Sequence, residues 1–294
     1  MNEALLALRG ALAETGAGFI AAAIALAVPA LAFALIAFIA DMKGALAKAR
    51  AASGEVRTNL TLYAFDLLCI APALAFLAAG FAGFVQENGA SFAHDAWTAA
   101  PTWAVLIVTI FVGDAVSYWR HRLEHTKWLW PAHAIHHSDE RMTWTTLLRF
   151  HPLNRLTSVL IDSAALALLG FPPWAIAANN LVRHYYGMFI HMDLPWTYGP
   201  LGRVFVSPAM HRWHHVRDGE GVGSNFATVF SVFDQAFATH YVPGPCAAPL
   251  GVREDLGQGA LGQLAHPFRV LGAWLGVRAR RPLPEAAAAS KTAA

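Results

Sequence analysis

The feature that most limits the fold is a run of 24 residues, 17–40, that contains no charged side chain. A transmembrane helix needs about 20 mostly apolar residues to cross a hydrocarbon core of roughly 30 Å. The run is too long for the apolar region of a signal peptide, and it lacks a convincing cleavage site. It therefore predicts a retained membrane anchor.

Three further apolar segments follow the anchor. Residues 62–85 and 103–119 read as two more spans, whereas 156–190 is divided at Pro172-Pro173 into two shorter pieces. Together these pieces predict a helical hairpin that dips into the membrane and returns. Only 14% of the residues are charged, whereas a soluble domain carries about a quarter. The sequence thus predicts an all-α integral membrane protein, with a stem of about three spans plus this hairpin.

Basic residues in short loops predict the orientation, because they are retained on the cytoplasmic side. One group lies between the first and second spans and a second group follows the third span. A third group, near the C-terminus, is on the same side provided that the hairpin returns. We therefore expect the cytoplasm to hold Lys43, Lys48, Arg50 and Arg57, then Arg120, Arg122 and Lys127, and finally Arg278, Arg280 and Arg281.

We expect three regions: N-terminal transmembrane helices in 1–102, a catalytic domain in 103–245, and an interfacial segment with a disordered tail in 246–294. The net charge of +2, without a long basic tract, predicts no nucleic-acid partner. Cys69 and Cys246 fit neither a disulfide framework nor a CxxC metal site. The interfacial segment carries Leu264, Phe268, Leu271 and Leu275 at helical spacing.

Histidine is the unusual residue of the chain, because eight of the fourteen fall into three spaced groups. Residues at i, i+3 and i+4 lie on one face of a helix. A lone buried histidine is usually a satisfied core residue, but burying eight imidazoles without partners is costly. The groups are "HRLEH" with His121 and His125, "HAIHH" with His133, His136 and His137, and "HRWHH" with His211, His214 and His215.

These groups predict a centre of two metal ions, because neutral imidazole binds transition metals and one ion rarely takes more than about six ligands. Two catalytic zinc ions, at three protein ligands each, leave histidines over. A haem protein needs only one or two axial histidines per haem. A redox-active iron pair, open to dioxygen and beside lipid, fits best. All three groups must meet on one membrane face, which requires the hairpin to return.

A function of a different class stays open, namely a membrane metal-binding or transport protein that uses the same histidines without redox chemistry. A transporter places its polar ligands near the bilayer midplane on broken helices. Here the first two groups lie in polar sequence outside the apolar runs. This placement favours an enzyme.

The order HxxxH, HxxHH, HxxHH resembles the membrane fatty acid hydroxylase / sterol desaturase superfamily, over about residues 114–243. "GDAVSYWRHRLEH", "HAIHHSDERMTWTTLLRFHP" and "MHRWHHVRD" with its following "SNFA" are similar to the histidine segments of that family, and "FDQAFATHYVP" to its closing segment. The resemblance implies a helical stem and a cytosolic cap that holds a functionally di-iron centre. It also implies that the active site faces the cytoplasm.

By the same resemblance the eight grouped histidines are metal ligands, and "FIHMD" supplies a ninth, His191. Asp193 replaces the family's asparagine in this segment, and His184, seven residues before His191, competes for the role. His151 of "RFHP" matches a recurrent family position, as a ligand or as a group behind one. The other departures leave the primary ligands in place: Phe233, Gln235 and Ala238 stand where the family usually has Trp, Arg and Gly.

The resemblance further implies that two iron ions use O2 and electrons from an external donor. The donor is a ferredoxin- or cytochrome-b5-like protein with its reductase. The reaction is hydroxylation or desaturation of an unactivated C–H position in a lipid, and the flanking segments favour hydroxylation.

Metal-bound histidines need the other ring nitrogen fixed by a carboxylate or carbonyl. Asp114 lies seven residues before His121, on the same helical face, and carboxylates within membrane segments are often functional. Helix packing is the alternative role for this residue. Asp139 and Asp234 are further candidates, against solvated or capping carboxylates, and Asn225 is a candidate by resemblance only.

Overall fold

The computed structural model describes residues 24–276, and within that range the fold is helical throughout. The pairings of β type among these residues are two isolated bridges, Phe205–Phe230 and Val216–Leu250. The prediction of an all-α fold is therefore confirmed. Three predicted features fall wholly or partly outside the described range: the start of the anchor, the basic residues after 277 and the C-terminal tail.

The longest helical rod contains the predicted second span. It runs without interruption from Ser53 to Glu87, and only 6% of its most apolar window is buried inside the molecule. Phe76, for example, is 83% exposed. An apolar surface of this extent suits contact with lipid. The rod consists of α3 (Ser53–Phe65), η1 (Asp66–Ile70) and α4 (Ala71–Glu87), and α2 (Ala45–Ala51) precedes it.

A second helix long and apolar enough to cross a membrane, α6 (Thr102–Glu124), contains the predicted third span. The short helix α5 (His94–Ala99) connects the rod to it. The described part of the predicted anchor, Ile24–Ala40, is a shorter apolar helix. The structure thus has two candidate spans, and the number of crossings remains a prediction.

The segment 156–190 forms two helical pieces, as its proline break predicts. Pro172 is extended and Pro173 begins the second piece. Gly170 has φ +80°, and a Cβ there would lie 2.7 Å from the backbone nitrogen of His94, so only glycine fits this turn. The pieces are α8 (Pro152–Thr157), η3 (Ser158–Ser163) and α9 (Ala164–Leu168), then α10 (Pro173–Ile190).

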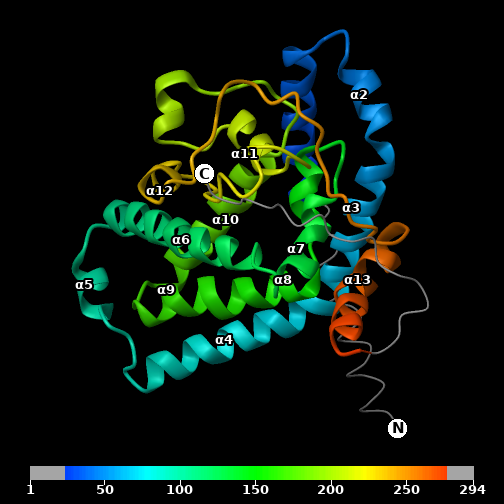
Figure 1. Ribbon diagram of the computed structural model, residues 1–294. Coiled ribbons are helices and arrows are strands. Elements are labelled where there is room, and N and C mark those ends of the chain that lie inside the picture. The colour runs from blue at the N-terminus through cyan, green and yellow to red at the C-terminus, as the bar shows by residue number, and fades with distance from the viewer. Residues whose placement is uncertain (1–23, 277–294) are drawn as a thin grey trace, which may run out of the picture.

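The two ends of this hairpin lie close together, next to His136. The ring of Phe150, just before α8, stacks on His136, and His191, just after α10, lies against the same imidazole. Figure 1 shows α4, α8–α9 and α6 as neighbouring layers, with α5 at the end remote from α7 and α8. The return of the hairpin to its starting place is therefore present in the fold, whatever its relation to a bilayer.

Two turns of these layers are π-helical, η1 and η3, and such turns frequently occur at functional sites. Pro72 follows η1 closely and lacks the N–H that a regular helix would use. Each π-helix carries a buried carboxylate, Asp66 in η1 and Asp162 in η3. Both carboxylates line the cavity described below.

The remaining elements include the two short helices, α7 and α11, that carry the two HxxHH motifs. The C-terminal helix α13 contains the predicted amphipathic segment, and Leu264 packs there against the core residues Leu62, Ala134 and Ile135. Phe268 on the same helix is 60% exposed. These elements are α7 (Trp130–His137), η2 (Trp144–Leu148), η4 (Gly199–Arg203), α11 (Pro208–His214), α12 (Val232–Ala236) and α13 (Gly259–Trp274).

Candidate metal centre

Nine histidines converge from the C-terminal ends of four helices. The helix starts are fixed locally: Pro131 stands in the first turn of α7, and the Ser207 hydroxyl caps α11 by accepting from the backbone nitrogen of Met210 at 3.1 Å. Both helices are short, so their last turns present several histidines at once. The contributions are His121 and His125 from α6, His133, His136 and His137 from α7, His191 after α10, and His211, His214 and His215 from α11.

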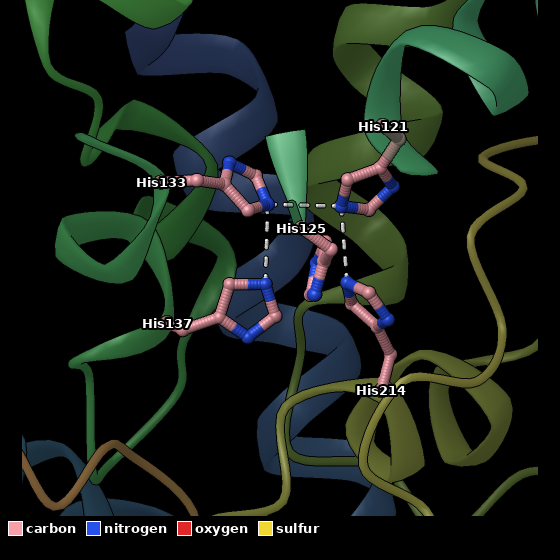
Figure 2. Close-up of side chains that lie close together, drawn as sticks. All are labelled: His121, His125, His133, His137 and His214. Atoms are coloured by element: carbon pink, nitrogen blue, oxygen red, sulfur yellow. Dashed lines mark hydrogen bonds between the residues drawn. The ribbon is translucent and has the colours of Figure 1, made fainter. Parts of the chain in front are cut away.

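The nine imidazoles form two clusters, in each of which the candidate ligand atoms lie within 4.8 Å of one another. Two nitrogens on opposite sides of an ion with bonds of about 2.1 Å are about 4.2 Å apart, so the separations suit one ion per cluster. Figure 2 shows the first cluster, with its rings turned toward one another. The five-histidine cluster is His121, His125, His133, His137 and His214, and the four-histidine cluster is His136, His191, His211 and His215.

Each HxxHH motif is divided between the clusters. On α7, His133 and His137 join the five-histidine cluster while His136 joins the other. On α11 the division is reversed, since His214 alone belongs to the five-histidine cluster. The i and i+4 rings therefore share one cluster, and the i+3 ring reaches the neighbouring one. The two clusters are in contact, with the rings of His137 and His215 stacked at 4.3 Å.

The protonation of the rings leaves lone pairs facing one another. Nδ1 of His121 donates to the carbonyl oxygen of Phe226 at 2.7 Å, and Nδ1 of His214 donates to that of Ser224 at 2.6 Å. In a neutral imidazole the other nitrogen then has no proton. Yet the two Nε2 atoms lie 3.0 Å apart. Two lone pairs at this distance repel, and a cation between the rings removes the repulsion.

In the four-histidine cluster one ring has its tautomer fixed in the same way. Nδ1 of His191 donates to the carbonyl oxygen of Gly187 at 2.6 Å, which leaves Nε2 as an acceptor, 2.9 Å from Nε2 of His211. Both ring nitrogens of His215 are buried and have no hydrogen-bond partner within residues 24–276. Such a donor set fits a transition metal.

Burial keeps these imidazoles neutral. It lowers the pKa of each of the eight that lie outside the candidate membrane helices, and neighbouring histidines lower most of them further. The pKa falls to about 4 for His191 and His214. The rings are therefore unprotonated at neutral pH, as metal coordination requires.

The carbonyls behind His121 and His214 belong to one segment, residues 224–230, which we call the strap. Its backbone is held by two buried carboxylates. Asp234 accepts from the nitrogens of residues 226 and 227 at 2.7 and 3.0 Å. Asp114 accepts from those of residues 228, 229 and 230 at 3.3, 3.0 and 2.8 Å. Five successive backbone N–H groups are thus fixed.

The four candidates for groups behind the ligands differ in what they touch. Asp114 and Asp234 act on the strap and not directly on an imidazole. Asn225 lies within the strap at φ +57°, and its side chain donates to the carbonyls of residues 210 and 241 at 2.9 and 2.7 Å. Asp139 accepts instead from Asn59 and Thr146, at 3.0 and 2.7 Å. Within the described chain its carboxylate makes no hydrogen bond to a histidine.

Two residues behind His133 were missed at the sequence level. Glu124 Oε2 is 3.5 Å from Nδ1 of His133, and the side-chain amide of Asn154 is 3.3 Å from the same nitrogen. Glu124 is fully buried and also accepts from Arg120 at 2.7 Å. The signal was present, because Glu124 is the acidic residue of "HRLEH" itself.

His151 and His184 lie outside both clusters. His151 caps α8, where its Nδ1 accepts from the backbone nitrogen of Leu153 at 3.1 Å, and its Nε2 donates to the carbonyl of Leu264 at 3.1 Å. Its two ring nitrogens are therefore already used. His184 is half-buried and lines the cavity next to the clusters.

A cavity of about 540 Å³ reaches both clusters. His121 and His133 of one cluster and His136, His191 and His211 of the other form part of its wall. Another part of the wall belongs to the long rod and is mostly apolar. Its apolar lining there is Leu67, Ala71, Leu74, Ala75 and Ala78. A small molecule with an alkyl part fits beside the histidines.

Comparison with known proteins relates this chain to lipid-modifying enzymes. The family model described as fatty acid hydroxylase matches residues 106–239. Ornithine lipid hydroxylase OlsE of Rhizobium tropici is 30% identical over 165 residues, which cover 55% of this chain and 50% of that protein. Alkylglycerol monooxygenase of Danio rerio is 33% identical over 144 residues, 49% of this chain and 31% of that protein.

A plant relative is less similar in sequence, but the alignment covers a larger share of its length. Methylsterol monooxygenase 2-2 of Arabidopsis thaliana is 25% identical over 206 residues, 64% of this chain and 70% of that protein. The chain spans half or less of the length of the ornithine lipid and alkylglycerol enzymes. No solved structure matches the chain significantly.

Proposed function

Because this chain belongs to the membrane fatty acid hydroxylase / sterol desaturase superfamily, we propose that it is a membrane-bound di-iron oxygenase that hydroxylates a lipid. The observation that carries the proposal is the convergence of nine imidazoles in two clusters, each of which contributes to the wall of one cavity. The printed names of the relatives, two hydroxylating or oxygenating enzymes of polar lipids and one of methylsterols, support a lipid as the substrate class.

Each cluster holds one iron ion in this proposal. When bound, the pair supplies reaction of O2 with an unactivated C–H bond, so that R–H, O2, two electrons and two protons give R–OH and water. The protein positions the lipid in the cavity and holds the ligating rings in the required tautomer through the strap and Gly187. Removal of a second hydrogen in place of oxygen transfer would give a double bond, which is the desaturase outcome.

The electrons come from a separate ferredoxin- or cytochrome-b5-like protein with its reductase. The exposed apolar surface of the 35-residue rod supports insertion in a membrane. The basic residues around the predicted spans support an active site on the cytoplasmic face. The catalytic region proposed above, 103–245, includes the whole family match.

The test is conversion of a lipid by the full-length protein in membranes, supplied with ferrous iron, 18O2, ferredoxin, ferredoxin reductase and NADPH. Mass spectrometry of the extracted lipids should find a gain of one 18O atom in one lipid, and only with iron present. A loss of two hydrogens would instead identify a desaturase. Metal movement across vesicles without any change in lipid mass would contradict the oxygenase and favour a metal transporter that uses the same histidines.

A further inference from the structure

The cavity has a second polar end, formed by Asp66 on η1 and Arg155 on α8. Asp66 Oδ2 lies 3.1 Å from Nε of Arg155. Asp66 is only 7% exposed, and its Oδ1 has no hydrogen-bond partner among residues 24–276. A buried carboxylate oxygen that accepts no hydrogen bond costs free energy, so a ligand that donates a hydrogen bond to Oδ1 would be favoured.

The carboxylates of the other ion pairs in the cavity have both oxygens occupied, although Nε of Arg183 has no hydrogen-bond partner among residues 24–276. Asp162 accepts from Arg120 through one oxygen at 2.8 Å and from Arg183 through the other at 3.2 Å. Arg120 also donates to Glu124 at 2.7 Å and to Ser117 at 2.9 Å. Among the carboxylates that line the cavity, the free capacity to accept a hydrogen bond is therefore at Asp66, beside Arg155.

This end of the cavity is close to the proposed metal centre. The guanidinium carbon of Arg155 lies 4.9 Å from the centre of the Phe150 ring. That ring is stacked on the imidazole of His136, with 4.6 Å between centres and 4° between planes. One phenyl ring thus separates Arg155 from the four-histidine cluster, and all three side chains line the same cavity.

The wall next to Asp66 is suited to an alkyl chain. Leu67, Ala71, Leu74, Ala75 and Ala78 line the cavity and recur at helical spacing along one face of the rod. Three of these five are alanines, whose small side chains leave space along the helix. A lipid whose polar group rests at Asp66 and Arg155 has an apolar surface for its chain and histidines within the same cavity.

We propose that Asp66 and Arg155 bind a neutral group of the lipid substrate that both donates and accepts hydrogen bonds, namely a hydroxyl or an amide. The pair has no net charge. A cationic group attracted by Asp66 is repelled by Arg155, and an anionic group attracted by Arg155 is repelled by Asp66, so neither charge gains much from the pair. A hydroxyl or amide donates to Oδ1 of Asp66 and accepts from the guanidinium. The inference rests on the proposed function and names its substrate class.

The test compares four C16 ligands on the full-length protein in phosphatidylcholine nanodiscs, with empty nanodiscs to correct for partition into lipid. Tritiated hexadecan-1-ol and hexadecanamide represent the two neutral groups, and hexadecylammonium and palmitate represent the two charges. Equilibrium binding should be about tenfold tighter for each neutral ligand than for either charged one. If one of the two neutral ligands binds more tightly than the other, it identifies whether the site recognises a hydroxyl or an amide.

Two variants should change the order of the four affinities, one in favour of the anionic ligand and the other in favour of the cationic ligand. In Asp66→Asn the charge of Arg155 is no longer balanced, so palmitate should become the tightest ligand. In Arg155→Met the charge of Asp66 remains, so hexadecylammonium should become the tightest. Asp218→Asn is the matched control, because Asp218 pairs with Arg253 on the surface and does not line the cavity.

A gain of binding cannot result from misfolding, so the switch separates recognition from stability. Equal wild-type affinities for the four ligands, or variants that retain the wild-type order, would overturn the proposal. Binding is measured without iron, oxygen or an electron donor. If the protein binds the neutral ligands selectively but oxidises no lipid, the binding site stands and the oxygenase proposal is overturned. If it oxidises a lipid but binds the four ligands without selectivity, the oxygenase proposal stands and the binding site is overturned.

Discussion

The five-histidine and four-histidine clusters share α7 and α11 but differ in what lies behind their rings. In the first, His121 and His214 donate to carbonyls of the strap, and His133 faces Glu124 and Asn154. In the second, His191 donates to the carbonyl of Gly187. Within the described chain, His125 Nε2 is the unpartnered ring nitrogen of the first cluster, whereas His136 Nδ1, His211 Nδ1 and both nitrogens of His215 are unpartnered in the second. Groups behind metal ligands raise their basicity and fix their orientation, so the clusters should bind metal unequally.

The largest effect should follow from removing a ligand of the four-histidine cluster. We expect His136→Ala to abolish lipid oxidation and to lower the iron content from two ions toward one. His136 is the only α7 ring in the four-histidine cluster, which is left with three. Iron per protein by mass spectrometry and product by lipid analysis check this. His94→Ala is the control: His94 is exposed, belongs to neither cluster, and should leave both readings unchanged.

Graded metal removal should show the difference between the clusters directly. As a chelator is titrated in, we expect the four-histidine cluster to lose its ion first. Loss of a group behind a ligand typically weakens metal binding about 10- to 100-fold, and this cluster has fewer such groups. Iron per protein should therefore fall in two steps. A single step would show that the clusters bind metal alike, and two steps that His136→Ala does not reduce to one would show that the weaker step does not belong to the four-histidine cluster.

Loosening the strap should affect the five-histidine cluster alone. Asp234→Asn keeps the size of the side chain but replaces one of the two oxygens that accept from the strap backbone. We expect about tenfold weaker metal binding at the tighter step of the chelator titration, since Asp234 acts through the carbonyl of Phe226. The weaker step should not move.

Asp114→Asn should give the same result through the other half of the strap, and Asp218→Asn should give none. If Asp114→Asn instead weakens the four-histidine step, then the strap is not the route by which this carboxylate acts.

The smallest effect should come from His151, a candidate ligand that lies outside both clusters. His151→Ala removes an N-cap of α8, so unfolding should become easier by about 1 kcal/mol. Its two ring nitrogens are occupied by the backbone of residues 153 and 264, so the iron content should stay at the wild-type value. Thermal unfolding and iron analysis of the same sample check both halves. A loss of iron would place His151 among the ligands.

The sequence predicted much of the stem because the relevant physical signal is local. A mostly apolar stretch of about 20 residues lies in lipid or in a core, and the predicted spans 62–85 and 103–119 lie within the two candidate membrane helices of the structure. Pro172-Pro173 predicted the break within 156–190 because proline ends the preceding helix. The strap was not predictable as a structure. Its carboxylates, Asp114 and Asp234, are 120 residues apart in the sequence, and nothing local to either shows that they hold the same backbone.

The sequence by itself determined which histidines are unusual, because imidazoles at i, i+3 and i+4 must stand on one side of a helix end. It also singled out His191 by resemblance, and the fold brings that ring to the other eight. Only the tertiary structure decided how the rings are divided. A helix turns about 100° per residue, so His136 and His137 point to different neighbours, and only the packing of α6, α10 and α11 around α7 assigns one ring to each cluster.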